Sequence, residues 1–71
     1  MTRSEHVAWC KERALNELKY GGPGDAVASM LSDMGKHDET APVVLGPDGM
    51  LGMMEIARGP DAVRRWVEGF N

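Results

Sequence analysis

The sequence predicts a small all-α domain, and three observations support this prediction. Apolar residues recur at helical spacings of three and four positions in several segments. Residues that favour helix starts precede these segments, and glycines and prolines separate them. A chain of 71 residues has room for one domain only. We therefore expect a single small helical domain over residues 1–71, a bundle of about four short helices at approximately 4–20, 25–35, 48–58 and 60–69, with an irregular connection at 36–47.

The first predicted helix covers residues 4–20. Thr2 and Glu5 have the spacing of a capping box, in which a hydroxyl and a carboxylate each accept a hydrogen bond from a free backbone N–H group. The segment 21–24, Gly-Gly-Pro-Gly, ends the helix, since proline cannot continue the hydrogen-bond ladder. We expect Leu15 and Leu18 to lie in the core, as part of a broad apolar stripe of Val7, Ala8, Cys10, Ala14, Leu15 and Leu18.

The second and the last predicted helices are also amphipathic. Asp25 is a good N-cap for the second helix, and Gly35 is a good C-cap. Pro60 suits the first turn of the last helix, where its missing N–H group costs nothing. The apolar faces consist of Val27, Met30, Leu31 and Met34 in the second helix, and of Ala62, Val63, Trp66, Val67 and Phe70 in the last.

The segment between these helices allows two interpretations. Pro42 and Pro47 bracket Val-Val-Leu, and residues 46–49, Gly-Pro-Asp-Gly, are typical of a turn. A short β-hairpin at 43–52 would make the protein α+β. The residues after the turn are methionine-rich and not β-branched, so we favour the helix at 48–58. That helix would be apolar on nearly its whole circumference, and we expect it to be buried on several sides.

Composition argues against a secreted, membrane-spanning or nucleic-acid-binding protein. No apolar run approaches the ~20 residues that cross a bilayer, and the N-terminal residues lack the apolar core of a signal peptide. Cys10 is the single cysteine, which suits a reducing, cytoplasmic location. The net charge is −3, and Arg64 and Arg65 are the only adjacent basic pair. Nucleic acid is therefore an unlikely partner, although a small DNA-binding regulatory module is the alternative function, with this pair on phosphates.

No motif predicts a catalytic, cofactor or metal site. His6 and Cys10 are four residues apart, and His37 and Asp38 are conceivable further zinc ligands, but two ligands do not make a site. We expect Cys10 to be a small buried residue and His6 to be solvated. The glycines at 21–24 follow a helix and lack a phosphate-binding lysine, so they do not form a phosphate loop. We expect no enzyme activity and no cofactor.

Two features indicate a protein-binding surface. Trp9, Arg13 and Tyr20 lie opposite the apolar stripe of the first helix, and aromatic residues and arginine dominate interface hot spots. Five methionines follow Met1, and methionine is common both in irregular cores and on adaptable binding surfaces. Taken singly, each feature is better explained within the molecule, by another helix packing beside Trp9 and by methionines filling the core. The candidate partner surface is Trp9, Arg13, Tyr20, Met53 and Met54.

These features predict a non-enzymatic protein that binds another protein and forms a homo-oligomer, most simply a dimer. A short chain has little interior for so many apolar side chains, and a two-fold interface would cover those left in water. We expect this interface to include methionines of the 48–58 helix or Trp9.

Three stretches of the chain resemble small proteins encoded by tailed bacteriophages that infect actinobacteria. The stretches are Ala8–Leu15, Ala28–Met34 with Lys36–His37 and Glu39–Thr40, and Arg64–Asn71. The Pro42–Leu51 stretch departs from the resemblance. The resemblance implies a phage origin and a host-cell cytoplasm, but no activity and no catalytic residue.

Overall fold

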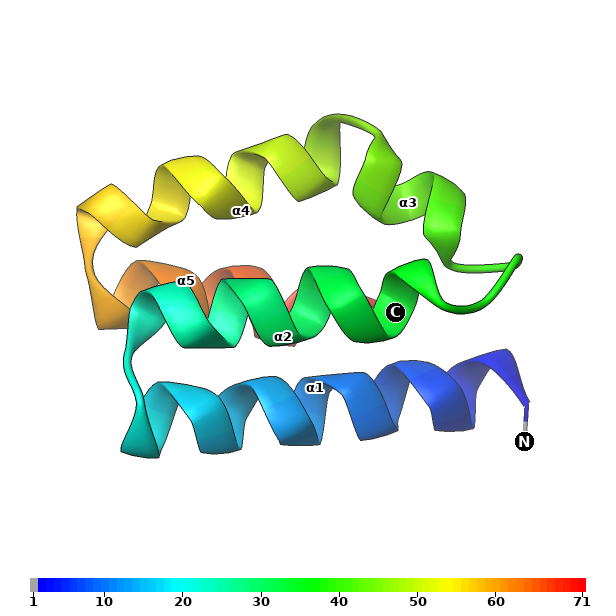
Figure 1. The fold of residues 1–71 in the computed structure, drawn as a ribbon, viewed down its shortest axis with the longest axis horizontal. Helices are drawn as coiled ribbons and strands as arrows, with labels where there is room; N and C mark the ends of the chain where they lie inside the picture. The colour runs from blue at the N-terminus through cyan, green and yellow to red at the C-terminus, as the bar shows by residue number, and fades with distance from the viewer. Residues whose placement is uncertain (1) are drawn as a thin grey trace.

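A computed structural model describes residues 2–71, and these residues form five α-helices and no β-strand. The all-α prediction is therefore confirmed. Figure 1 shows α2 between α1 and α4, with α5 behind α2, and α2 contacts all four other helices. The helices are α1 (Arg3–Tyr20), α2 (Pro23–Gly35), α3 (Ala41–Leu45), α4 (Pro47–Arg58) and α5 (Pro60–Glu68).

The capping box predicted for the first helix is present. The backbone N–H of Glu5 donates to Thr2 Oγ1 at 3.1 Å, and the backbone N–H of Thr2 donates to Glu5 Oε1 at 3.0 Å. At the other end, the N–H groups of Gly21 and Gly22 both donate to the Glu17 carbonyl. The start and the end of α1 are thus set by local hydrogen bonds that the sequence pattern predicts.

Glycine-proline pairs begin three of the helices. Pro23, Pro47 and Pro60 are the first residues of α2, α4 and α5, and a glycine is the N-cap in each case. Gly22 has φ 128° and Gly59 has φ 109°, backbone angles that residues other than glycine rarely adopt. The second helix begins at Pro23, two residues before the predicted start. Its predicted N-cap, residue 25, lies in the first turn instead.

The connection at 36–47 was predicted to be irregular. This prediction is wrong for residues 41–45, which form α3. Thr40 is fully buried, and its hydroxyl donates to the Met34 carbonyl at 2.5 Å, which fixes the entry into α3. The hairpin alternative at 43–52 is wrong. The N–H of Gly46 donates to the Val43 carbonyl, and the N–H of Met50 donates to the Gly46 carbonyl, so both flanks of the turn are bonded locally.

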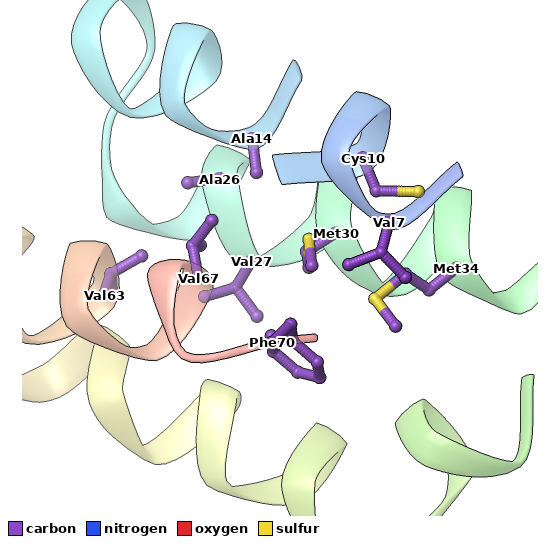
Figure 2. Packing of buried hydrophobic residues seen from close by; sticks show 10 residues of the cluster. All are labelled: Val7, Cys10, Ala14, Ala26, Val27, Met30, Met34, Val63, Val67 and Phe70. Carbon is purple, nitrogen blue, oxygen red and sulfur yellow. The ribbon is translucent and has the colours of Figure 1, made fainter. Parts of the chain in front are cut away.

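The core is formed by α1, α2 and α5 together with Phe70 (Figure 2). Leu15 and Leu18 are only partly buried and pack against its edge, so the prediction that they lie in the core holds in part. The predicted apolar faces of α2 and α5 do point into the core. Helix α4 contributes no side chain to the buried cluster, which consists of Val7, Cys10, Ala14, Ala26, Val27, Met30, Met34, Val63, Val67 and Phe70.

Candidate partner-binding surfaces

The five residues predicted as one partner surface lie on two separate surfaces. Trp9, Arg13 and Tyr20 belong to α1, whereas Met53 and Met54 belong to α4. Within residues 2–71, α1 and α4 do not contact each other. Figure 1 shows them at opposite edges of the bundle, with α2 between them. The structure therefore does not bring the five residues together.

Trp9 and Arg13 are engaged within the molecule. Arg13 Nε donates to Asp33 Oδ2 at 2.8 Å, and Asp33 is a buried residue of α2. The guanidinium carbon of Arg13 lies 4.8 Å from the centre of the Trp9 ring, which is a cation–π geometry. The other neighbour of Trp9 is His6, stacked at a ring-centre distance of 6.2 Å. The contact of Arg13 with Asp33 joins α1 to α2, whereas Trp9 contacts two residues of its own helix and is 40% exposed.

Tyr20 is the most exposed aromatic side chain of the described chain. It is 79% exposed at the C-terminal end of α1. The Lys19 ammonium group lies 5.3 Å from the centre of its ring. This single large side chain does not form an extended apolar surface.

The inner face of α4 is made of glycine and a carboxylate. Gly49, Gly52 and Glu55 are the buried residues of the helix. A Cβ atom at Gly52 would overlap the indole of Trp66, and one at Gly49 would overlap the backbone carbonyl of Val44. Side chains are thus excluded at positions 49 and 52, because the α4 backbone itself packs there against α5 and the end of α3.

The outer face of α4 is apolar and exposed. Met50, Met53 and Met54 are 63–70% exposed, and Ala57 is also exposed. Positions 50, 53, 54 and 57 follow the i, i+3, i+4, i+7 spacing, so they lie on one face of the helix. We call these four residues the methionine stripe. The three charged residues of the helix lie outside the stripe, at positions 48, 55 and 58.

The expectation that this helix would be buried on several sides is therefore wrong. Its apolar residues point outward because glycines occupy the side that meets the bundle. The explanation that methionines fill the core holds for some of these residues only. Met30 and Met34 fill the core, whereas the methionines of α4 are exposed.

His6 is buried, contrary to the expectation that it would be solvated. Its ring centre lies 3.8 Å from that of His37, which comes from the segment between α2 and α3. Burial lowers the pKa of His6, and the neighbouring His37 lowers this pKa further. Cys10 is buried as predicted. Its Sγ lies 3.6 Å from His6 Nε2, and burial raises the pKa of the Cys10 thiol.

Over residues 2–71, no group of three or more His, Cys, Asp or Glu residues has an arrangement that could hold a metal ion. The buried Asp33 is instead bound to Arg13 and, at 3.6 Å, to Lys36 Nζ. The His6–His37 contact is non-local, and no local sequence pattern marks it.

The adjacent arginines of α5 do not stand in a basic patch. Arg64 donates to Asp61 Oδ1 and forms an ion pair with it. Arg65 and Glu68 line the same shallow hollow as this pair. Acidic side chains thus flank the two arginines on the exposed face of the helix. Phosphate binding favours basic residues without such acidic neighbours.

No protein-family model, curated protein or solved structure matches this chain at a significant level. In the part of the chain that the structure describes, no helix is long and apolar enough to cross a lipid bilayer.

Proposed function

We propose that this chain is a non-enzymatic protein-binding domain and that the methionine stripe of α4 is its binding surface. The observation that supports this proposal is the orientation of α4. Three methionines of this helix are 63–70% exposed, while its buried face consists of Gly49, Gly52 and Glu55. The helix therefore adds no apolar side chain to the core and presents several to the outside.

The physical argument rests on the free energy of exposed apolar surface. Removing such surface from water is worth roughly 25 cal/mol per Å², and contiguous apolar patches on soluble domains are most often interaction sites. Methionine side chains are unbranched and polarisable, so they adapt to the shape of a partner. Leu51, at 44% exposure, widens the apolar surface on one flank of the stripe.

The resemblance to proteins of tailed phages makes a phage protein or a host protein in the host-cell cytoplasm the expected partner. The chemistry of the stripe requires an apolar partner face without an unpaired charge, since the stripe has no charged group to neutralise one. We find no observation that favours the alternative of a DNA-binding module. The ion pair between Arg64 and Asp61 argues against it.

The test is differential capture with matched surface variants. Immobilised wild-type protein, the Met53→Asp variant and the Tyr20→Asp variant are incubated with lysate of an actinobacterial host, and retained proteins are quantified by mass spectrometry. Both substituted side chains are well exposed and lie on different helices, so both variants should fold. We expect a protein retained by the wild type and by Tyr20→Asp, but not by Met53→Asp. Equal retention by all three would refute the assignment of the stripe.

A further inference from the structure

We infer that the methionine stripe pairs with the same stripe of a second copy of this chain, in an antiparallel, two-fold symmetric contact between α4 helices. This inference rests on the proposed function, because it names one partner for the surface assigned above. Three properties of α4 support it: the symmetry of the stripe, the sizes of its side chains and the distribution of charge along the helix.

The stripe has the symmetry that a two-fold interface requires. Positions 50, 53, 54 and 57 have the same spacing read in either direction, so a two-fold axis at the level between Met53 and Met54 superimposes the pattern on itself. In a closed dimer the same patch is used by both subunits and must complement itself. A two-fold antiparallel contact places Met53 beside the partner's Met53, and Met54 beside the partner's Met54.

Side-chain size favours the antiparallel direction. At the ends of the contact, the long side chain of Met50 lies opposite the partner's Ala57, and the reverse holds at the other end. Large and small residues then face each other and fill the space evenly. A parallel pair would place two Met50 side chains together and two Ala57 side chains together, with crowding at one end and a void at the other.

Charge favours the same direction. The stripe itself carries no charge, so its burial leaves no unpaired ion. Asp48 lies in the first turn of α4 and Arg58 in the last. Arg58 is already ion-paired with Glu55 of its own helix, and Asp48 lies beside Arg65 and Trp66 of α5. The preference for the antiparallel direction therefore comes from the two helix dipoles, which oppose each other in an antiparallel pair and align in a parallel one.

The size of the stripe sets the strength of the dimer. A helix of 12 residues is roughly 18 Å long at about 1.5 Å per residue. One such contact covers less than the roughly 800 Å² per partner of a standard stable interface. We therefore expect a monomer–dimer equilibrium in the micromolar range, which a stronger partner for the same surface would displace.

Sedimentation equilibrium from low to high micromolar concentration tests this inference. For the wild type and for Tyr20→Asp we expect reversible association of the 7.7 kDa chain to a dimer. Met53→Asp and Met53→Lys should each be monomeric, because the substituted residue of each copy would lie beside the same charge in the other copy, and like charges repel. Circular dichroism verifies that each variant is folded.

Mixing the variants tests the direction of the pair. An antiparallel pair places position 53 of one copy beside position 53 of the other, so a mixed dimer of Met53→Asp with Met53→Lys brings opposite charges together. This mixture should recover association, with a dissociation constant at least tenfold lower than that of either variant alone. A parallel pair predicts recovery for Met53→Asp mixed with Met54→Lys instead, and that result would overturn the antiparallel arrangement.

The outcomes separate this inference from the proposed function. A wild-type chain that remains monomeric at the highest concentration overturns the inference, while selective capture of a host protein through Met53 would still support the function. A dimer that survives Met53→Asp but dissociates with Trp9→Asp overturns the inference by placing the contact on α1. If Met53→Asp alters neither dimerisation nor capture, both proposals fail.

Discussion

His6 is a buried imidazole whose surroundings favour the neutral form. Its ring contacts His37 and lies near the thiol of Cys10, and Asp33 is the acidic group that favours its protonation. Asp33 is itself ion-paired with Arg13 and Lys36. Burial is the largest cause, so the pKa of His6 in the folded protein lies below its ordinary value of 6.5.

This lowered pKa makes folding stability depend on pH. Below pH 6.5 the unfolded chain binds a proton at His6 more readily than the folded chain does, so the free energy of unfolding should fall as the pH falls through 6.5. Above pH 6.5, His6 is neutral in both the folded and the unfolded chain, and its titration no longer lowers the free energy of unfolding. Urea denaturation at a series of pH values measures the effect, and His6→Gln should flatten the curve there. The contribution of Glu5, whose lowered pKa reflects hydrogen bonds to Thr2, lies in a separate range, below 4.5.

Core and edge positions should differ in their sensitivity to truncation. Met30 is fully buried, so Met30→Ala should cost about 2–5 kcal/mol of the free energy of unfolding. Leu18 is partly buried at the edge of the core, so Leu18→Ala should cost less than Met30→Ala. Chemical denaturation of both variants provides the comparison. A larger loss for Leu18→Ala would contradict this packing.

Single residues were predictable from the sequence where local pattern decides their environment. The burial of Cys10 and Met30 follows from helical periodicity, and the structure confirms both. The burial of His6 does not, because His37 reaches it from a segment 31 positions further along the chain. The pairing of Arg13 with Asp33 was likewise hidden, since it joins two helices whose relative rotation no local pattern specifies.

At the scale of elements, the two buried glycines of α4 decide how this helix meets the bundle. A Cβ atom at Gly49 would overlap the carbonyl group of Val44, which is backbone and cannot rotate away. At Gly52 the obstacle is the indole of Trp66, whose Nε1 also donates to the Asp48 carbonyl at 2.9 Å. Close contact of the backbone thus replaces side-chain packing along this helix.

Alanine at Gly49 should therefore destabilise the protein, although alanine is the better helix former. We expect Gly49→Ala to lower the free energy of unfolding by at least ~1 kcal/mol, as overpacking does. Gly24 is the matched control, because nothing lies within 4 Å of a Cβ placed there in α2. Gly24→Ala should raise stability by up to ~1 kcal/mol. Thermal and urea denaturation measure both, and equal effects of the two substitutions would contradict the close approach at Gly49.

Helix ends were more predictable than helix orientation. The capping box of α1 and the glycine-proline start of α5 follow from local chemistry, and both are observed. Helix α3 was not predicted, because a helix of five residues is too short to show a helical period in its apolar residues. The prediction that α4 is buried on several sides is wrong because its many apolar residues favour burial, whereas the side that meets the bundle is set by residues without side chains, Gly49 and Gly52.

At the scale of the whole molecule, the buried apolar residues are unevenly distributed among the helices. Helix α2 contacts every other helix, and its residues form much of the core together with α1 and α5. Helix α4 meets α2, α3 and α5 but adds no apolar side chain to this core. Regions with few buried apolar contacts open at lower free energy than the rest of a fold.

Hydrogen exchange should reveal this division. In dilute solution, amides of α4 should exchange faster than those of α2, because α4 can open while α1, α2 and α5 remain packed. Raising the concentration of the wild type should slow exchange in α4 selectively, since pairing of two methionine stripes ties opening of the helix to dissociation. Met53→Asp should abolish the concentration dependence and leave exchange in α2 unchanged. Amides of α4 as protected as those of α2 at every concentration would show that the glycine contacts alone hold this helix as firmly as the core.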